Sequence, residues 1–269
     1  AAAEQLARCG ATLVVVGRDG ERNERVIAEL AASTGNPSIT QIPADMGDLE
    51  QVRHLAERVL AAHDRLDVLI HNAGALDPER RVAPGGTEAT VASQVVGPFL
   101  LTRLLLDRLA ASAPARVLTM SSGGMYATGL KVSELEMAPE DYNGAEQYAR
   151  AKRAQVTLNE MWADRFGDLG ITFHALHPGW ADTPGVDAGL PTFAKVMGPF
   201  LRTPEQGADT LVWLAADDTA LASNGRFWLD RAPRPIHKLP TTKGTDTAER
   251  RRRLWSWVAE TADATTVNT

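Results

Sequence analysis

The run Leu13-Val14-Val15-Val16, followed at once by Gly17-Arg18, indicates the fold class of this chain. Consecutive apolar residues that do not alternate with polar ones are typical of a strand buried on both faces of a parallel sheet. Further short strands are expected at residues 38–43, 66–70, 116–120, 171–177 and 225–229. Helical segments separate them, so the sequence predicts βαβ units and an α/β fold with a doubly wound parallel sheet.

The predicted helices occupy most of the remaining chain. They are expected at residues 1–9, 20–33, 48–63, 87–111, 144–166 and 204–216, and a last helix closes the sequence. With 269 residues, of which 44% are hydrophobic, the chain is long enough to bury the core of one large α/β domain. We therefore expect a single domain over residues 1–269, in which residues 233–269 form a C-terminal extension.

The charge balance excludes some classes of partner. The formal net charge is −6, and a mildly acidic chain without a basic block is a poor candidate for binding nucleic acid. The basic run Arg250–Arg253 adjoins Leu254, Trp255 and Trp257. A surface helix that docks its tryptophans is the favoured interpretation, and a basic amphipathic helix that touches a membrane is the alternative. No window reaches the length of a transmembrane span.

Cysteine usage bounds the redox environment. Cys9 is the sole cysteine, which excludes an intramolecular disulfide and a cysteine metal cluster. We expect no metal site, and a reducing intracellular compartment, most simply the cytoplasm, fits this composition.

Polar residues and glycines follow several predicted strands at the points where those strands end. Because the carboxyl ends of parallel strands meet at one edge, and ligands of doubly wound sheets bind there, these residues are expected to share one rim. They are Arg18, Asp45, Asn72, Ser122 and Pro178-Gly179.

Tyr148 and Lys152 lie four residues apart in a predicted helix, which puts both side chains on one face, one turn apart. A phenol has an ordinary pKa of about 10, so it exchanges protons poorly at neutral pH unless its phenolate is stabilised. A lysine ammonium one turn away can supply that stabilisation. The pair is a candidate acid/base device, and the alternative is an exposed tyrosine beside a solvated lysine.

The order of these motifs resembles the short-chain dehydrogenase/reductase family. The resemblance rests on Asn72-Ala73-Gly74, Ser122, Tyr148-x-x-x-Lys152, and Pro178-Gly179 with Thr183, which match in order and rough spacing across nearly the whole chain. It implies a Rossmann-like fold and hydride transfer between a nicotinamide cofactor and a carbonyl or alcohol.

By this resemblance, three residues do the chemistry. Ser122 would hold the substrate oxygen, and Tyr148 would donate a proton to it or remove one. Lys152 would bind the ribose hydroxyls and lower the pKa of the tyrosine. Ser121 stands beside Ser122, and the sequence does not decide which of them faces the site. His71 and His177 are expected to be structural.

The resemblance also implies cofactor contacts. Asp45 would lie near the adenine, Asn72 and Gly74 would support the sheet and allow close approach, and Thr183, after Pro178-Gly179, would bind the nicotinamide carboxamide. The alternatives are that Asn72–Gly74 is only a tight turn and that Asp45 only begins a helix.

Arg18 governs the predicted choice of cofactor. An acidic residue at the end of this strand binds the ribose 2′-hydroxyl of NAD, whereas an arginine accepts the 2′-phosphate of NADP. Arg18 holds that position. Asp19 comes one residue later and would bind the ribose 2′-hydroxyl only with strain. The sequence therefore predicts NADP(H), with NAD(H) the less favoured choice.

The chain departs from the family pattern at Gln94. The family has Asn-x-x-Gly-x-Phe here, and its asparagine completes a proton relay to the lysine and kinks its helix. This chain has Gln94-Val95-Val96-Gly97-Pro98-Phe99. Glutamine keeps the amide but moves it by one methylene, and the alternative is that Gln94 is simply an exposed or tolerated helix residue. Either way the relay is in doubt, and slower turnover is the hypothesis.

The second departure is larger. The family's first strand and its Gly-x-x-x-Gly-x-Gly loop are absent, and residues 1–9 match the later part of the helix that follows that loop. The strand belongs in the middle of the sheet, so its neighbours are expected to have open edges, and the pyrophosphate loses its binding loop. The sequence is then a fragment, a short form with a rearranged sheet, or a non-enzymatic derivative. We expect poor NADP(H) binding by this chain alone, and a pseudoenzyme or interaction protein is the alternative function.

The substrate class and the oligomeric state are less constrained. Several apolar residues are expected near the site and favour a small hydrophobic carbonyl or alcohol, although such clusters are more often core. They are Met125, Tyr126, Trp180, Phe193 and Met197. Many relatives pair through the helices equivalent to those of Gln94 and Tyr148, so the resemblance is compatible with a homodimer.

Overall fold

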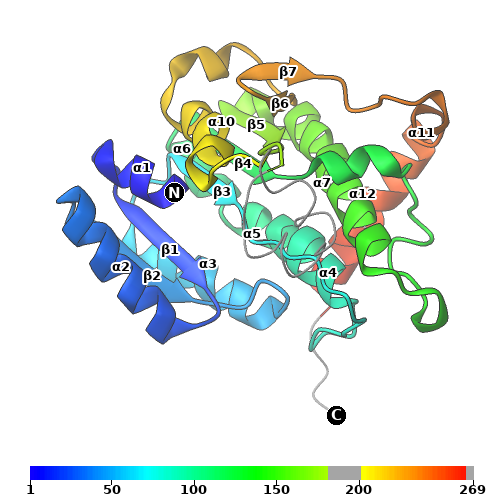
Figure 1. The fold of residues 1–269 in the computed structure, drawn as a ribbon, viewed down its shortest axis with the longest axis horizontal. Coiled ribbons are helices and arrows are strands. Elements are labelled where there is room, and N and C mark those ends of the chain that lie inside the picture. The colour runs from blue at the N-terminus through cyan, green and yellow to red at the C-terminus, as the bar shows by residue number, and fades with distance from the viewer. Residues whose placement is uncertain (181–200, 265–269) are drawn as a thin grey trace.

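The computed structural model describes residues 1–180 and 201–264, and within them strands alternate with helices as the sequence predicts (Figure 1). Each predicted strand is present within one or two residues. The strands are β1 (Leu13–Gly17), β2 (Ile39–Pro43), β3 (Val68–His71), β4 (Ala115–Met120), β5 (Ile171–Leu176) and β6 (Phe227–Leu229). A further strand, β7 (Ala232–Arg234), was not predicted, and it pairs antiparallel with β6.

The strands form two separate sheets. In the described residues β1 pairs only with β2, while β3 begins a sheet of order β3-β4-β5-β6-β7 whose pairs from β3 to β6 are parallel. Figure 1 shows the β1–β2 pair set apart from the larger sheet. The predicted open edges are therefore confirmed, on β1 and on β3, and Val16 on β1 is 39% exposed.

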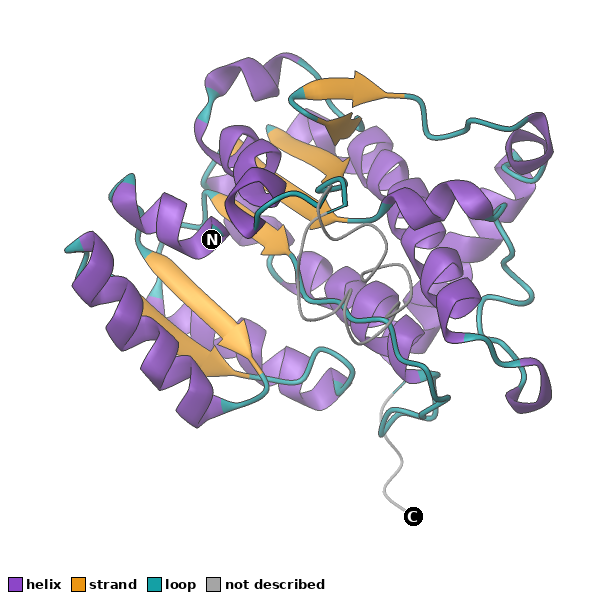
Figure 2. Ribbon diagram, in the orientation of Figure 1, coloured by secondary structure: helices purple, strands orange, loops and turns teal. Residues whose placement is uncertain are grey.

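Helices cover both faces of the larger sheet (Figure 2). On one face α7 (Gly144–Phe166) and α5 (Gly97–Leu104) pack over β4 and β5, and α3 (Leu49–Ala62) adjoins α5. On the other face α10 (Pro204–Ala216) packs on β4 and β5 and contacts α1 (Ala2–Arg8). The fold is a Rossmann-like α/β fold with a parallel sheet.

The segment expected as one helix over residues 87–111 is helical from residue 89 to residue 111 but irregular. The segment divides into α4 (Ala89–Val91), a π-helical turn (Ala92–Val96), α5, and α6 (Leu106–Ala111). A Cβ at Gly97 would collide with the backbone oxygen of Met46, so only glycine allows this close approach. Pro98 has no amide proton, so the regular hydrogen-bond ladder of the helix cannot continue through it. The π turn lies directly before α5, which contains this proline.

The remaining helices are α2 (Gly20–Thr34), α11 (Pro240–Gly244) and α12 (Ala248–Asp263). The basic run begins α12, which packs against α5 and α7. Its residues Leu254, Val258 and Ala262 are fully buried, and the Trp255 ring lies 4.9 Å from those of Phe99 and Trp162. The tryptophan-docking interpretation is thus confirmed for Trp255.

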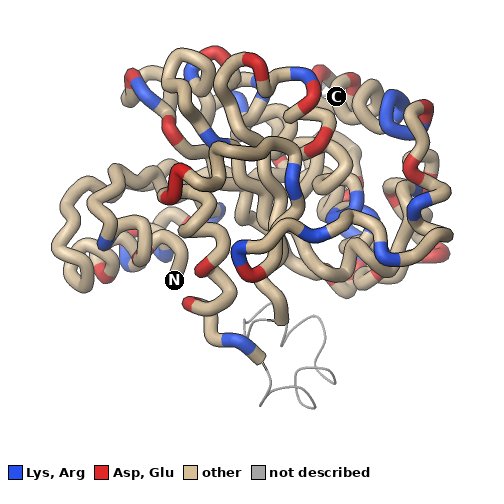
Figure 3. The backbone as a smooth tube through the Cα atoms, turned by 90° about the horizontal axis from the view of Figure 1, so that it is seen from above, with Lys and Arg blue, Asp and Glu red and all other residues tan. Residues whose placement is uncertain are grey.

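Charged residues of both signs are interspersed along the backbone (Figure 3). Across residues 1–180 and 201–264, no helix is long and apolar enough to cross a bilayer. The same residues contain no group of three or more His, Cys, Asp or Glu side chains placed to hold a metal ion.

Candidate active site

Ser122, Tyr148 and Lys152 meet at the carboxyl end of β4. Ser122 follows that strand, and Tyr148 and Lys152 lie on α7. Asn143 caps this helix by accepting a 3.0 Å hydrogen bond from the Glu146 amide. The Lys152 Nζ lies 5.2 Å from the centroid of the Tyr148 ring, and the Ser122 side chain lowers the pKa of the Tyr148 phenol.

The structure separates the roles of the two adjacent serines. The Ser121 hydroxyl is buried and donates a 3.1 Å hydrogen bond to the backbone oxygen of Lys152. Ser122 is the serine that contacts Tyr148, and its Oγ also accepts a 3.1 Å hydrogen bond from the Gly124 amide. Alternation along an extended backbone sends the two side chains to opposite sides.

Burial and Ser122 act in opposite directions on the pKa of the Tyr148 phenol. Burial raises the pKa of Tyr148, and the hydrogen bond from Ser122 opposes that change. Lys152 is itself buried, which lowers its own pKa to about 7, and its Nζ donates a 3.0 Å hydrogen bond to Met120 O. In this arrangement Ser122 favours the phenolate.

Gln94 lies inside the molecule, beside the same site. It is 2% exposed, so the interpretation as an exposed residue is wrong. Its Nε2 donates a 2.7 Å hydrogen bond to Ala75 O, while its buried Oε1 has no partner among the described residues. Gln94 also belongs to the π turn, so the helix is distorted at this residue despite the change from asparagine.

Arg18 and Asp45 lie at the ends of β1 and β2, as predicted. The Arg18 Nη1 is 4.0 Å from the Asp45 Oδ2, and both side chains are largely exposed. The other Asp45 oxygen accepts a 2.8 Å hydrogen bond from the Gly47 amide, whereas Asp48 caps α3. Asp19 caps α2 by accepting from the Arg22 amide, so its carboxylate is already engaged.

Asn72 and Gly74 follow β3 and are exposed. Asn72 makes no side-chain hydrogen bond to the described residues, so the expected support of a continuous sheet is not found, because β3 is here a sheet edge. Gly74 adjoins two side chains of the site. A Cβ at Gly74 would be 3.1 Å from Lys152 Nζ and 3.2 Å from Gln94 Oε1. The glycine therefore keeps the space beside these two groups open.

The two histidines make structural contacts. His71 Nε2 lies 2.7 Å from the Thr102 hydroxyl, and His177 stacks on Phe227 at 5.5 Å and accepts from the Gly179 amide. Burial lowers the pKa of each to about 4, so both are neutral at pH 7. Gly179 has a φ of 77°, which favours glycine. Thr183 lies outside the described residues.

The apolar residues expected near the site separate in the structure. Met125 is fully buried in a small core cluster with Phe227, so it does not line a substrate site. Tyr126 is partly exposed and donates a 2.7 Å hydrogen bond to Pro235 O. Trp180 is 49% exposed, and Phe193 and Met197 lie outside the described residues.

Comparison with known proteins decides the family. A protein-family model described as "Enoyl-(Acyl carrier protein) reductase" matches residues 1–227. Human dehydrogenase/reductase SDR family member 12 is 37% identical over 250 residues, which cover 93% of this chain and 78% of the relative. The chain belongs to the short-chain dehydrogenase/reductase family. Bovine retinol dehydrogenase 12 is 32% identical over 256 residues, covering 94% and 79% of the two chains.

Solved structures of this family share the fold. The Pseudomonas aeruginosa RhlG/NADP active-site complex matches with a TM-score of 0.65 and 24% identity, covering 84% of this chain and 87% of that one. The relatives' names support an oxidoreductase of the short-chain dehydrogenase/reductase family.

The rim residues fit part of the nicotinamide cofactor that this family uses. The unpartnered Gln94 Oε1 and the open space at Gly74 adjoin Lys152, where polar groups of a ribose would find partners. Arg18 offers an exposed guanidinium for a phosphate. The described residues before β1 contain no glycine-rich loop to hold a pyrophosphate.

Sequence reasoning missed Gln155 and Arg153, both buried on α7. Gln155 Nε2 donates a 2.6 Å hydrogen bond to Gln94 O, and Arg153 contacts the segment that follows Ser122. Gln155 stands seven residues after Tyr148, two helical turns along one face, and that spacing was an available signal. Arg153 had no comparable signal, because its contacts come from segments distant in sequence.

Proposed function

We propose that this chain is an NADP(H)-dependent oxidoreductase that interconverts a carbonyl and an alcohol through Ser122, Tyr148 and Lys152. One observation carries the proposal: Ser122 follows β4, its side chain lowers the pKa of the Tyr148 phenol, and the buried Lys152 lies one helical turn from Tyr148 with its Nζ 5.2 Å from the ring. In the proposed reaction, the Tyr148 hydroxyl would donate a proton to the substrate oxygen, and the Ser122 hydroxyl would donate a hydrogen bond to the same oxygen. Membership of the short-chain dehydrogenase/reductase family supports it.

Each residue has a distinct task in the proposed mechanism. The bound nicotinamide would supply or accept the hydride. Ser122 holds the substrate oxygen, and Tyr148 donates its hydroxyl proton to that oxygen during reduction or removes the proton during oxidation. Because Ser122 stabilises the phenolate, it lowers the energy of the state that Tyr148 reaches after proton donation.

Lys152 and Gln94 would hold the cofactor and replace the proton. A lysine whose pKa is about 7 can both lose and regain a proton near neutral pH. The Gln94 amide lies beside the same opening as Lys152 Nζ, as the space at Gly74 indicates. We propose that Lys152 binds ribose hydroxyls and that Gln94 Oε1 orders a water for the relay.

NADP(H) is the proposed cofactor. Arg18 is exposed at the end of β1, its partner Asp45 is 4.0 Å away, and Asp19 is engaged as a helix cap. A loosely paired guanidinium remains able to bind a 2′-phosphate. The NADP-bound RhlG structure supports a nicotinamide cofactor in this fold. Asp45, Asn72, Gly74, Pro178, Gly179 and Thr183 complete the proposed set of cofactor contacts.

The substrate is proposed to be a small, hydrophobic carbonyl or alcohol. Tyr126 lies in the segment after Ser122, and Trp180 lies in the loop that follows β5. Both side chains present aromatic surface there. We also propose that the chain does not pair through α5 and α7, because α12 packs across both helices. A homodimer of the kind compatible with the resemblance would have to displace α12.

The open edges of β1 and β3 favour a second candidate function, an interaction protein that has kept the fold without turnover. NADPH oxidation with a panel of apolar ketones and aldehydes distinguishes the two, with Tyr148→Phe as the control. We expect turnover that falls ~100-fold or more in the variant. NADPH binding is measured in parallel on a chain extended before Ala1 by a strand and a glycine-rich loop. Activity that survives Tyr148→Phe, or no binding and turnover by either chain, contradicts the proposal.

A further inference from the structure

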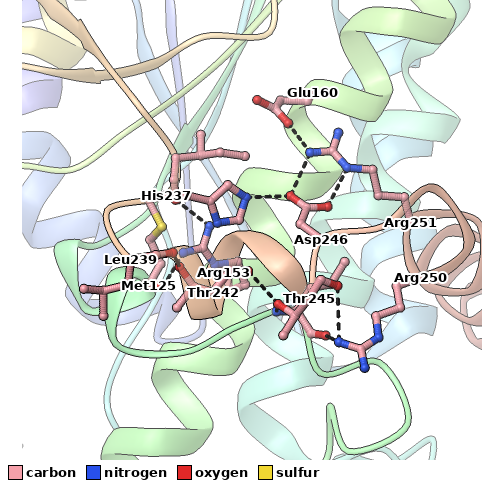
Figure 4. Close-up of polar contacts among 12 residues, drawn as sticks. Met125, Arg153, Glu160, His237, Leu239, Thr242, Thr245, Asp246, Arg250 and Arg251 are labelled. Atoms are coloured by element: carbon pink, nitrogen blue, oxygen red, sulfur yellow. Dashed lines mark hydrogen bonds and ion pairs between the residues drawn. The ribbon is translucent and has the colours of Figure 1, made fainter.

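Arg153 directly follows Lys152 on α7 and is fully buried, yet it forms no ion pair with the described residues (Figure 4). Its guanidinium donates to three backbone oxygens. The distances are 2.8 Å to Met125, 3.2 Å to Thr128 and 2.6 Å to Ile236. Burial lowers its pKa, which reflects the cost of holding a charge away from water. A buried guanidinium that donates hydrogen bonds to backbone carbonyls holds in place the segments to which those carbonyls belong.

Two of the three oxygens belong to the segment that begins at Ser122. That segment, residues 122–130, opens with a 3₁₀ turn, Gly123–Ala127, in which the Met125 amide donates a 3.2 Å hydrogen bond to Ser122 O. The Met125 oxygen in turn accepts from Arg153. Ser122 is thus tied to α7 through one hydrogen-bonded turn and one guanidinium, beside the residue that would bind the cofactor.

The third oxygen belongs to a second segment, residues 235–246, which we call the C-terminal strap. The strap contacts the Ser122 segment at several points beyond Arg153. Tyr126 donates to Pro235 O at 2.7 Å, Lys238 Nζ lies 4.3 Å from the Tyr126 ring, and the Thr245 hydroxyl accepts from the Leu130 amide at 2.8 Å. Arg153 lies where the strap, the Ser122 segment and α7 meet.

The strap is connected to α7 a second time, through Arg251 of α12 (Figure 4). His237 Nε2 lies 2.9 Å from Asp246 Oδ2, and Asp246 Oδ1 accepts from Arg251 Nε at 2.6 Å. Arg251 Nη2 then donates to Glu160 of α7 at 2.6 Å. This connection reaches α7 through Arg251 of α12, whereas Arg153 contacts the strap and the Ser122 segment directly from α7.

We propose that Arg153 is a positioning residue that holds the Ser122 segment and the C-terminal strap on α7, so that the Ser122 hydroxyl stays in register with Tyr148. This inference rests on the proposed function, since it assigns Arg153 a task within the Ser122–Tyr148–Lys152 site. Tyr126 of the Ser122 segment, which we propose lies on the substrate side, donates to Pro235 O of the strap. Loss of Arg153 releases the strap and Ser122 together.

The test compares Arg153→Met and Arg153→Lys with Arg150→Met. Arg150 is a matched control because it is also a buried arginine on α7, but it contacts Glu146 and the Glu134 backbone. We expect kcat/KM for a carbonyl substrate to fall ~100-fold in Arg153→Met, because a small misplacement of a reacting group has that effect. The NADPH Kd should not change. Arg153→Lys should recover part of the loss, since a lysine can still donate to one or two of the carbonyls.

Two further readouts separate positioning from folding. The pH profile of alcohol oxidation should shift to higher pH in Arg153→Met and not in Arg150→Met, because a displaced Ser122 no longer favours the Tyr148 phenolate. Amide hydrogen exchange should rise in residues 123–130 and 235–246 and remain unchanged in β1 and β2.

Each outcome bears on the inference. Equal kinetic losses in Arg150→Met and Arg153→Met, or an unshifted pH profile with normal kcat/KM in a folded Arg153→Met, would overturn it. If the wild-type chain shows no turnover, the proposed function fails, while hydrogen exchange still reports whether Arg153 holds the two segments. Unchanged exchange in both segments overturns the inference independently of activity.

Discussion

Gln155 of α7 donates a 2.6 Å hydrogen bond to the backbone oxygen of Gln94, inside the π turn. Both residues are buried, and the bond joins the helix that carries Tyr148 and Lys152 to the helix that carries Gln94. A π turn widens the helix locally, and such turns often occur at functional sites. The distortion expected of an asparagine is present here with a glutamine.

Restoring the family's asparagine should therefore not increase turnover. The Gln94 amide already reaches Ala75 O and lies beside the opening at Gly74. Gln94→Asn withdraws the amide by one methylene and leaves a void. Gln94→Leu removes the polar group and should lower kcat ~10-fold if the amide serves proton transfer. We expect a smaller effect than the loss of a direct acid/base catalyst, because Gln94 would act through a water. Steady-state rates of both variants test this, and a faster Gln94→Asn would show that the glutamine limits the relay.

The paired serines provide a test with a built-in control. Ser122→Ala should lower kcat ~100-fold, because it removes a donor to the reacting oxygen and the hydrogen bond that favours the Tyr148 phenolate. Ser121→Ala should leave kcat unchanged and reduce the free energy of unfolding by about 1 kcal/mol, through the lost bond to Lys152 O. Turnover and urea unfolding of both variants measure the contrast. The reverse pattern would assign the site to Ser121.

Arg18→Ala should weaken NADPH binding by at least ~10-fold and leave NADH binding nearly unchanged, since only NADPH carries the 2′-phosphate. Arg22→Ala is the control, because Arg22 is an exposed arginine on α2 that lies beyond the end of β1. Fluorescence titration with both cofactors gives the ratio. Equal losses for NADPH and NADH would remove Arg18 from phosphate recognition.

Lys152 should make stability depend on pH. Its pKa is about 7 in the folded chain against 10.5 in the unfolded one, so between these values the unfolded chain binds a proton that the folded chain does not. Stability from this group therefore rises with pH across that window, by at most about 1.4 kcal/mol per pH unit. Lys152→Met should have a larger free energy of unfolding than the wild type. The difference should be greatest at about pH 6 and smaller at about pH 9.5. Urea unfolding at several pH values measures the difference, and a constant difference would contradict the lowered pKa.

The buried residues of α12 should control self-association. Leu254→Arg places a charge in the core against α5 and α7, which should release α12 and expose their apolar face. We expect the wild type to have the mass of one 28.9 kDa chain in light scattering and the variant to show concentration-dependent dimers. Arg253→Glu, at an exposed position of the same helix, should remain a monomer. A dimeric wild type would mean that another surface mediates pairing.

The sequence alone determined the alternation of elements and the rim residues. The short apolar run at residues 13–16 specifies a strand of a parallel sheet, because such strands need no polar face when helices cover both sides. The expected burial on both faces is not found in β1, whose residues are partly buried or exposed. Tyr148 and Lys152 were predictable because a four-residue spacing fixes their relation within one helix. The open edges of β1 and β3 were also predictable, because the family places a strand between them and this sequence does not supply one.

Only the tertiary structure decided which neighbours these residues meet. Ser122 rather than Ser121 faces Tyr148, Met125 lies in the core, and burial moves the pKa of Lys152 to about 7. Arg153 gathers carbonyls from residues 125, 128 and 236, which no local pattern connects. Burial and backbone contacts between distant segments depend on how the whole chain packs, so a sequence pattern specifies the face of an element but not what covers it.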